Sequence, residues 1–378
     1  MKKESILLIG PKETKRNYGY GGGAGGYVAN LRRYETLLKD HFNVNTFYLS
    51  SRNSKYKLLV YINFPLRFFF DLIRFIYIIK DSKNSTIHLL GQYRTSVYRE
   101  LFIVLLAKIF SLKSIYDIRA GAFINTYNNS NFLYKFFVRS IIKLSDNFLV
   151  ESLIYKKYLA KKFKRNSYYL PNFLPYDLVK NYKNKLKQTI KKNNYIDLLY
   201  VGNCSSSKGL NQLIEATDIL SKKYKNIKLN LVGNIEEEIV KSKVLTKLIQ
   251  KKIIIIYGVL SPEKIYDLMI KSTIYVYPSM HKGEGHNNSI NEAACFEFPV
   301  ITTRNGFLSE AFSNNEMYFL KNYNPVNPKE IVNMIKKIIN YPEEAKNKTT
   351  KAKNKIIEKF TSKAIINNLL SAYKPSNW

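Results

Sequence analysis

The sequence predicts an α/β protein of two units, each built around a parallel sheet. At 378 residues the chain is long for a single core, and a typical domain size of about 150 residues suggests two. Short β-branched or aromatic runs alternate with longer amphipathic stretches in both halves, as in βαβ proteins. Between the halves, residues 182–194 are polar, rich in Lys and Asn and weakly periodic, which indicates a linker.

The strands are expected where short apolar runs end in polar residues or glycine. In the first half these runs cover residues 6–10, 44–49, 86–90, 114–118 and 147–151. In the second half they cover residues 196–202, 227–233, 253–258, 273–278 and 300–303.

Helices are expected where apolar residues recur with a helical period between these runs. They cover residues 28–41, 66–80, 97–110 and 131–143, then 210–224, 262–270 and 289–296, and most of 328–370. We therefore expect an N-terminal domain at 1–180, a linker at 181–194 and a C-terminal domain at 195–355. A last helix within 356–378 is expected to return to the N-terminal domain.

The ends and the cysteines indicate a cytoplasmic protein. The apolar run before Pro11 is too short for a secretory signal and fits a first strand. The longest apolar stretch, residues 58–79, is interrupted by Arg67, Asp71 and Arg74, so no membrane span is expected. The two cysteines are far apart and belong to no C-x-x-C or Cys/His cluster, which argues against a disulfide scaffold or a zinc site.

The net charge of +33 leaves two interpretations open. Residues 1–180 contain 30 basic and 11 acidic residues, so the excess is +19 there and +14 in the rest of the chain. It can be a compositional bias, because Lys, Asn, Ile and Tyr are all abundant. It can also serve an anionic partner: nucleic acid, an acidic lipid surface or a phosphate-bearing substrate. No nucleic-acid-binding module is recognisable, so we expect no nucleic-acid partner.

Polar loops follow several of the expected strands, and ligands of parallel sheets bind at the carboxyl ends of strands. A glycine-rich stretch, GYGGGAGGYVANL, starts at residue 19, too far from the first strand for a nicotinamide-cofactor motif. In the second half, VGNCSSSKGL places Gly202 at a strand end, with Ser205–Ser207 able to cap the next helix. Lys208 is expected in the first turn of that helix, where an anion would offset its poor fit to the helix dipole. The alternative is that Lys208 is simply solvated, as one of 61 basic residues.

The strongest signal is YPSMHKGEGHNNSINEAACFEFPVITT at residues 277–303, which runs strand, polar loop, short helix, strand. Glu284 precedes the helix and Glu292 lies about one turn inside it. Asn287, Asn288 and Ser289 supply cap-type residues at the start of the helix. A carboxylate can accept hydrogen bonds from a vicinal diol, and a helix amino end suits a diphosphate. Sugar, diphosphate and ribose are the parts of a nucleotide-sugar. The alternative, that both glutamates only favour the helix dipole, explains neither the strand-end position nor the adjacent Gly285.

This segment resembles the E-x7-E motif of the retaining glycosyltransferases of family 4 (group 1 glycosyltransferases). VGNCSSSKGLNQLIEA, LNLVGN, GGAGGYVANL and YLPNFL resemble further family segments, so the resemblance covers essentially the whole chain. It implies the GT-B fold, two Rossmann-like domains with parallel sheets facing across a central cleft.

The resemblance also implies roles for residues of this chain. Glu292 would hold the donor ribose, Glu284 the hydroxyls of the transferred sugar, and Lys208 the departing diphosphate. The implied catalytic residues are Glu284, Lys208 and Arg119. The implied donor site comprises Gly22, Gly23, Gly202, Asn203, Lys208, Gly233, Glu284, Gly285, His286, Asn287, Asn288, Ser289 and Glu292.

The family uses no metal, so the resemblance implies no cofactor, with a nucleoside-diphosphate-sugar as co-substrate. Lysine and helix dipole would stabilise the charge that a divalent cation stabilises elsewhere. The transfer would retain the anomeric configuration by front-face attack, with the departing phosphate oxygen helping to deprotonate the acceptor.

Two positions depart from the family pattern. Asn203 stands where the family usually has an arginine beside the lysine. Arg119, in IYDIRAGAF, stands where many members have a histidine; it either faces a phosphate or pairs with Asp117. His88 is expected to be structural, whereas His281 and His286 are better placed to touch ligands.

The N-terminal half sets the acceptor in this family. Residues 65–80 combine many apolar side chains with Arg67, Arg74 and Lys80. One hypothesis is that this stretch rests on an anionic membrane that holds a lipid-linked acceptor. The alternative is an ordinary buried helix.

The expected function is therefore transfer of a hexose-type sugar to a glycan or a polyprenyl- or lipid-linked oligosaccharide in the synthesis of cell-surface polysaccharide, lipopolysaccharide or capsule. The enzyme would be cytoplasmic or peripheral at the inner face of the plasma membrane. Two alternatives remain open. One is a sugar-nucleotide epimerase of the same fold; the other is a catalytically weak subunit of a glycosyltransferase complex.

Overall fold

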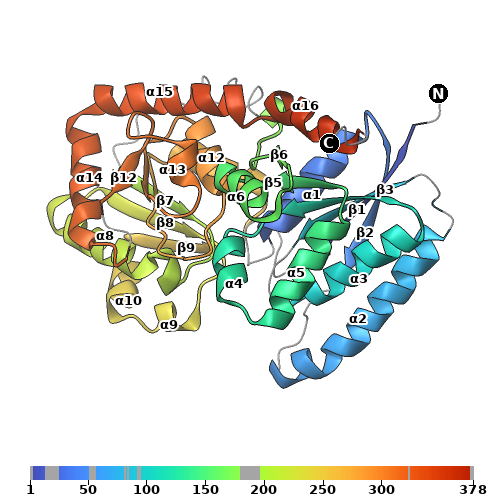
Figure 1. The fold of residues 1–378 in the computed structure, drawn as a ribbon. Helices are drawn as coiled ribbons and strands as arrows, with labels where there is room; N and C mark the ends of the chain where they lie inside the picture. Colours follow the sequence, from blue (N-terminus) through green and yellow to red (C-terminus); the bar gives the residue numbers. More distant parts are fainter. Residues whose placement is uncertain are drawn as a thin grey trace. The chain divides into compact units, whose positions relative to one another are not determined.

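The structure is a computed structural model that describes residues 3–12, 25–50, 57–80, 82, 85–91, 95–178, 196–321 and 324–374 (Figure 1). The chain forms two compact units. The first contains Tyr27–Pro171 with the N-terminal strand and the chain from Ile366 onward, and the second contains Asn172–Ile365. The expected linker, residues 181–194, lies outside the described residues.

The first unit has a parallel sheet, six-stranded within the described residues, in the order β2-β1-β3-β4-β5-β6. Its strands are β1 (Ser5–Pro11), β2 (Asn43–Leu49), β3 (Thr86–Gly91), β4 (Lys113–Ile118), β5 (Asn147–Val150) and β6 (Tyr168–Tyr169). The central strands β3 and β5 are buried along their whole length, as expected for a sheet covered by helices on both faces.

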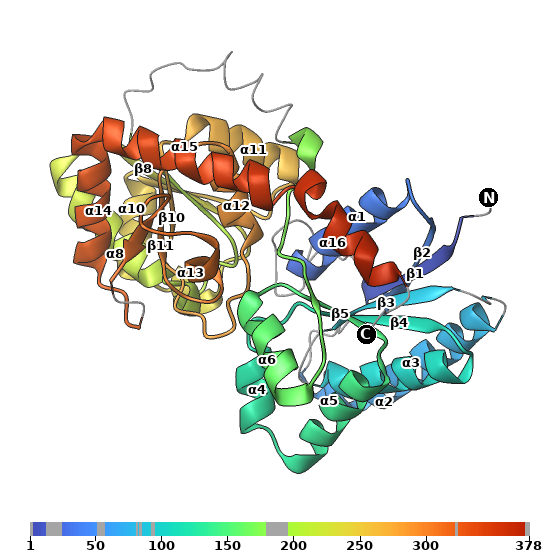
Figure 2. The ribbon, with the colours of Figure 1, turned by 45° about the horizontal axis from the view of Figure 1, so that its top comes forward.

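The helices of this unit divide between the two faces of the sheet (Figure 2). They are α1 (Gly25–Leu38), α2 (Lys57–Ile79), α3 (Ser96–Ile109), α4 (Phe123–Asn129), α5 (Phe132–Leu144), α6 (Leu153–Phe163) and, from Ile366 onward, α16 (Ser362–Tyr373). α1 and α16 cover one face, and α2, α3 and α5 cover the other, as right-handed crossovers require. The C-terminal helix is held to the sheet by Asn147, whose Nδ2 donates to the Ala372 carbonyl at 2.7 Å.

The second unit has a parallel sheet, again six-stranded over the described chain, in the order β12-β11-β10-β7-β8-β9. Its strands are β7 (Ile196–Val201), β8 (Ile227–Val232), β9 (Ile254–Gly258), β10 (Ile274–Tyr277), β11 (Val300–Thr303) and β12 (Tyr318–Leu320). The strand order reverses beside β7, because β8 lies on one side of it and β10 on the other.

The helices of the second unit are α8 (Leu210–Lys223), α9 (Glu237–Val240), α10 (Lys243–Gln250), α11 (Pro262–Lys271), α12 (Asn288–Cys295), α13 (Leu308–Ala311), α14 (Pro328–Asn340) and α15 (Pro342–Lys359). α14 packs beside α8, and α15 packs beside α12. Every residue of α12 is buried, polar ones included. The small side chains of Ala293, Ala294 and Cys295 allow this close packing.

The predicted fold class is confirmed: both sheets are parallel and alternate with helices, and each of the ten expected strands is present. The short strands β6 and β12 were not predicted, because two or three residues form no recognisable pattern. α2 begins at Lys57, before the predicted start at residue 66, and contains Pro65. A proline ordinarily ends a helix, so the sequence pattern alone placed the start too late.

Candidate functional site

The point where the strand order of the second unit reverses lies between β7 and β10. In open parallel sheets the loops after such neighbouring strands form the ligand site, because they diverge to opposite faces and leave room between them. Lys208 follows β7 and Glu284 follows β10. The topology therefore brings together the two residues that sequence motifs had singled out separately.

Lys208 and Glu284 form an ion pair across this point. The Lys208 Nζ lies 2.6 Å from the Glu284 Oε2, a charge-assisted hydrogen bond between residues 76 positions apart in the chain. The lysine side chain is 16% exposed and the glutamate side chain 6%. The ion pair is thus mostly buried, but part of the Lys208 side chain is still exposed to solvent.

Glu284 is held as a carboxylate by its neighbours. The Ser279 Oγ donates to its Oε2 at 2.5 Å, and the Asn287 Nδ2 donates to its Oε1 at 3.2 Å. Burial raises the pKa of the Glu284 carboxyl, but Lys208 and these two donors outweigh burial, so its pKa lies below the ordinary value. The site therefore presents one positive and one negative group at neutral pH.

Close backbone contacts tie the two loops together. The Met280 amide donates to the Ser207 carbonyl at 2.9 Å, which joins the loop after β10 to the loop after β7. Gly209 has a left-handed conformation (φ 74°), and a Cβ there would lie 2.1 Å from the Pro278 carbonyl oxygen. Gly306 (φ 62°) similarly leaves room for the Glu284 backbone, 2.4 Å from where a Cβ would stand. These glycines permit the approach that places Lys208 against Glu284.

The prediction that Ser205–Ser207 cap the helix after β7 is wrong. Ser206–Lys208 form a short 3-10 turn, and Gly209 occupies the N-cap position of α8 without any side-chain cap. Because Gly209 turns the chain sharply, Lys208 precedes the helix and is not part of its first turn.

The amino end of α12 is capped as predicted. The Asn287 Oδ1 accepts hydrogen bonds from the amides of Ser289 at 2.9 Å and Ile290 at 3.2 Å. The Ser289 Oγ accepts a hydrogen bond from the Tyr275 hydroxyl at 2.7 Å, which holds this turn against β10. A ligand that used the Ser289 amide would therefore have to displace the Asn287 side chain.

Glu292 lies one turn inside α12, as predicted, and is fully buried. Asn288 is buried beside the start of the same helix. Glu284 thus lies before α12 and Glu292 within it, as the sequence pattern indicated, and their contacts with a donor stay a prediction.

Three glycines end the first three strands of this unit. Gly202 follows β7, Gly233 follows β8 and Gly258 ends β9. A Cβ on Gly233 would lie 1.8 Å from the Gly202 carbonyl oxygen, so the two loops touch through their backbones. Next to them, the Asn203 Nδ2 donates to Glu236 Oε1 at 3.3 Å.

The two histidines near Glu284 differ in burial. His286 is buried; its Nδ1 accepts from the Asn172 amide at 3.1 Å, and its ring packs against Phe360 with centroids 4.9 Å apart. His281 is half-buried, and its carbonyl accepts from the Asn305 Nδ2 at 2.7 Å. His286 thus contributes to the packing of the loop, and its contact with a ligand stays a prediction.

Arg119 belongs to the first unit, where it pairs with Asp117. Its Nε lies 2.8 Å from one carboxylate oxygen and 2.9 Å from the other, and its Nη2 donates to the Tyr34 hydroxyl. Of the two roles left open for Arg119, the structure shows the pair with Asp117.

His88 completes this buried cluster of the first unit. Its Nδ1 lies 2.6 Å from the Tyr373 hydroxyl, and its Nε2 lies 3.4 Å from Asp117 Oδ2. Burial raises the pKa of Asp117, but Arg119 and His88 outweigh it, so the pKa lies below the ordinary value. His88 is structural, as expected.

The remaining features do not alter this site. Gly22 and Gly23 lie outside the described residues. Across the described chain, no group of three or more His, Cys, Asp or Glu side chains is gathered for a metal ion. Cys204 and Cys295 are free, and burial raises the pKa of each thiol to about 12.

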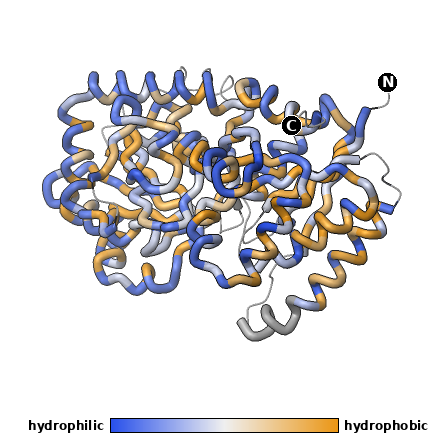
Figure 3. The backbone as a smooth tube through the Cα atoms, in the orientation of Figure 1, coloured by the Kyte–Doolittle hydropathy of each residue, from blue (hydrophilic) through white to orange (hydrophobic). Residues whose placement is uncertain are grey.

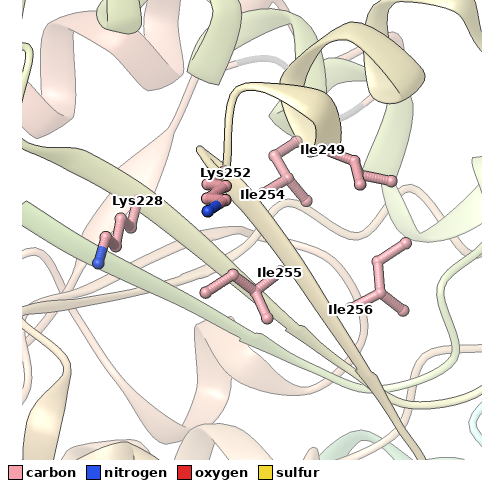
Figure 4. Close-up of a pocket in the computed structure, with 6 residues that line it drawn as sticks. All are labelled: Lys228, Ile249, Lys252, Ile254, Ile255 and Ile256. Carbon is pink, nitrogen blue, oxygen red and sulfur yellow. The ribbon is translucent and has the colours of Figure 1, made fainter.

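A hollow of about 470 Å³ lies elsewhere on the second sheet (Figure 4). It is lined by Lys228, Ile249, Lys252, Ile254, Ile255 and Ile256. Lys228 and Ile254 lie near the amino ends of β8 and β9, opposite to the strand ends that carry Lys208 and Glu284. The hollow is therefore separate from the candidate site.

Sequence reasoning missed several residues that position the site. Ser279 binds Glu284, and the phenol of Tyr277 lies 3.5 Å from Glu284 Oε1 under the Lys208 ammonium. Asn172 holds the loop through His286. The signal for Ser279 was available, because it directly follows a strand; those for Asn172 and Gly306 were not, because both are distant in sequence.

The fold defines the class of protein. HepE of Anabaena, solved in complex with UDP, is similar over 98% of this chain and 99% of its own, with a TM-score of 0.69 and 15% identity. A glycosyltransferase from Rickettsia africae is similar over 99% of this chain and 98% of its own, with a TM-score of 0.70 and 19% identity. The chain has the GT-B fold, as predicted.

The family follows from the sequence of the second unit. Residues 181–355 match the family described as Glycosyl transferases group 1, which confirms the predicted resemblance for this part of the chain. A relative from Staphylococcus aureus, the capsular polysaccharide biosynthesis glycosyltransferase CapM, is 30% identical over 194 residues, 50% of this chain. The match spans about half of CapM (49%).

Proposed function

We propose that the protein is a retaining glycosyltransferase that moves a hexose-type sugar from a nucleoside-diphosphate-sugar to a glycan or lipid-linked oligosaccharide. The observation that carries this proposal is the 2.6 Å pair of Lys208 and Glu284 at the point where strand order reverses. The group 1 family match supports the transfer, and the name of CapM supports a place in cell-surface polysaccharide synthesis.

We further propose that Lys208 binds the donor diphosphate and that Glu284 binds hydroxyls of the sugar. In the described structure each charge compensates the other, which keeps both side chains ready in a mostly buried place. A donor would offer phosphate oxygens to the ammonium and a diol to the carboxylate, so both charges would keep a partner after the ion pair opens. Glu292 would hold the ribose.

The proposed chemistry needs a stabilised leaving group. As the bond between the anomeric carbon and the phosphate oxygen breaks, negative charge develops on the diphosphate, and Lys208 is positioned to stabilise it. The departing phosphate oxygen would accept the proton of the acceptor hydroxyl, which attacks from the same face and so retains the anomeric configuration. The metal-independence of this step is part of the proposal.

The donor nucleoside is proposed to be uridine, because the similar structure of HepE contains UDP. A thermal-shift experiment that compares UDP with UDP-sugars tests the assignment, since a ligand that binds only the folded state raises the melting temperature. Lys208→Met should weaken UDP and UDP-sugar alike, by about tenfold or more for a lost charge-assisted contact. Glu284→Gln should weaken the sugar donor while UDP keeps its effect.

Lys247→Met is the matched control, because Lys247 forms a surface pair with Asp218 in the same unit. It should leave both ligands unaffected. Equal UDP binding by Lys208→Met and the wild type would show that the diphosphate binds elsewhere.

Turnover decides between a full enzyme and a catalytically weak subunit. The specific observation behind the second possibility is Asn203, which contacts Glu236 where the family usually has a cation. An active enzyme should release UDP from a donor, and Lys208→Met should lower this rate by about 10²–10³-fold. Donor binding without any release, with or without candidate acceptors, would favour the weak subunit. Release of an altered nucleotide-sugar without an acceptor would favour an epimerase.

We propose that the reaction takes place at the inner face of the plasma membrane, where a lipid-linked acceptor would be found. Among the described residues, no helix is both long and apolar enough to cross a bilayer.

A further inference from the structure

The first unit exposes large apolar side chains in one place. Of the 23 large apolar residues that are exposed in the described chain, 12 lie on α2, α3 and α5. These three helices lie side by side on the same face of the sheet (Figures 1 and 2). We call their outward surface the three-helix face; its anchors are Leu66, Phe69, Ile73 and Tyr77 on α2, Phe102 on α3 and Phe132 on α5.

The apolar residues of α2 follow a helical period on its outward side. Leu66, Phe69, Ile73 and Tyr77 recur every three or four residues, and Tyr77 is 70% exposed. The inward side is a separate stripe in which Phe75 and Ile79 are buried. α2 is therefore apolar on both sides, which a helix that only covers a sheet does not need. This exposure contradicts the alternative of an ordinary buried helix.

Ring contacts make the face continuous across the three helices. Phe68 of α2 packs edge-on against Phe102 of α3, with centroids 5.3 Å apart. Tyr98 of α3 packs against Phe137 of α5 at 4.9 Å. Phe132 at the start of α5 is 78% exposed. Figure 3 shows the same concentration of apolar residues along α2 and its neighbours, in contrast to the polar α14 and α15.

The charges on these helices are almost all positive. Asp71 and Glu100 are the two carboxylates in their sequences, and both are buried. Asp71 is paired with Arg99 at 2.8 Å, and Glu100 accepts from the Tyr116 hydroxyl at 2.5 Å. The Arg74 guanidinium lies over the exposed Phe70 ring and 3.8 Å from the buried Asp71 carboxylate, and the Lys80 ammonium lies over the Tyr77 ring. The face thus offers apolar side chains and cations without an exposed carboxylate.

We propose that the three-helix face docks on an anionic lipid bilayer. Apolar and aromatic side chains would enter the boundary between headgroups and acyl chains, and the flanking Arg and Lys would contact anionic headgroups. A second copy of the chain fits this face less well. A two-fold interface places the same surface on both partners, so the cations would face one another without a carboxylate to pair with.

The proposal is independent of the donor chemistry, because Lys208 and Glu284 belong to the other unit. Sedimentation with vesicles tests it on the full chain. The wild type and Lys208→Met should both bind phosphatidylglycerol vesicles, lose binding as salt is raised, and leave phosphatidylcholine vesicles largely unbound. If Lys208→Met binds vesicles but has lost donor binding, the two proposals are separated.

The decisive variant is Phe69→Gln/Ile73→Gln/Tyr77→Gln, which replaces exposed residues by good helix formers. It should weaken vesicle binding by about tenfold or more, because burial of three large apolar side chains is lost. The control is Val240→Gln/Val244→Gln/Ile357→Gln, three exposed apolar residues of the second unit, which should bind as the wild type does. Circular dichroism checks that both variants are folded.

Charge has its own pair of variants. Lys80→Gln/Lys143→Gln, directly after α2 and on α5, should weaken binding to phosphatidylglycerol, whereas Lys351→Gln/Lys359→Gln on α15 should not. Equal vesicle binding by the wild type and the folded triple apolar variant would overturn the proposal. So would a wild-type dimer that ignores vesicles and that the triple substitution converts to monomer, since the face would then join two copies of the chain.

Discussion

The two units each place a buried ion pair at the carboxyl ends of parallel strands, but the pairs differ in their surroundings. Asp117 and Arg119 in the first unit are at most 2% exposed in their side chains. Tyr34 and His88 enclose the pair, and Tyr373 from the C-terminal helix binds His88. Lys208 in the second unit is 16% exposed, and glycines line the nearby strand ends.

The comparison teaches that a charge at a strand end is not by itself a binding group. In the first unit large aromatic side chains fill the space, so the pair connects the sheet to α16. In the second unit glycines keep the backbones close and leave the lysine accessible. We therefore propose opposite roles: the first pair would stabilise the fold and the second would bind the ligand.

The largest expected effect is a difference in the free energy of unfolding when the cation of each pair is removed. Arg119→Met should lower the free energy of unfolding by about 3–5 kcal/mol, because it leaves the Asp117 carboxylate buried without its main partner. Lys208→Met should cost less, about 2 kcal/mol, since Ser279 and Asn287 still donate to Glu284. Urea unfolding followed by circular dichroism measures both.

The double variant Asp117→Asn/Arg119→Met is the control for this comparison. It should recover part of the loss, because the buried charge is removed together with its partner. Equal losses from Arg119→Met and Lys208→Met would mean that the two pairs have the same role.

The next effect concerns the strand-end glycines. Gly233→Ala should lower the free energy of unfolding by about 2 kcal/mol or more, because its Cβ would collide with the Gly202 carbonyl and its φ of 134° disfavours a side chain. Gly258→Ala is the matched control: it also has positive φ (68°) but meets nothing within 4 Å. It should cost only about 1 kcal/mol. If both cost the same, the backbone contact does not matter.

A smaller loss of stability is expected when α16 loses its hydrogen bond to His88. Tyr373→Phe removes the hydroxyl that lies 2.6 Å from His88 and should cost about 1 kcal/mol. Tyr341→Phe, on an exposed tyrosine at the start of α15, is the control and should cost nothing measurable. Thermal unfolding measures the difference. An unchanged melting temperature in Tyr373→Phe would show that the hydroxyl does not help to hold α16.

The smallest effect is in the pH dependence of stability. The pKa of Glu284 is lowered in the folded protein, so below its ordinary value of 4.5 the unfolded chain takes up the proton first. The contribution of Glu284 is fully present above pH 4.5 and is lost as pH falls through the folded pKa. Glu284→Gln should therefore lose less stability than the wild type on acidification, measured as melting temperature against pH.

Glu358→Gln, an exposed glutamate on α15, is the control and should follow the wild type. The Asp117 carboxyl, whose pKa is also lowered, keeps some acid sensitivity in every variant. If the melting temperature of Glu284→Gln followed the same pH dependence as the wild type, the pair with Lys208 would not stabilise the Glu284 carboxylate as proposed.

Local pattern in the sequence was enough to predict the two parallel sheets, because buried strands and amphipathic helices have different periods. The same applies to α12 and the placement of Glu284 and Glu292 around its amino end, since Asn287 is a strong cap and lies beside them in the chain. A family resemblance to the group 1 glycosyltransferases was visible in these same segments.

Tertiary structure alone decided which groups meet. The contact of Lys208 with Glu284 joins loops 76 residues apart, and it depends on Gly209 and Gly306 letting backbones approach. The choice of Asp117 as partner of Arg119, and the exposure of α2, also depend on what packs around them. Periodicity shows that a helix has an apolar stripe, but only packing shows whether a neighbour covers that stripe or leaves it facing out.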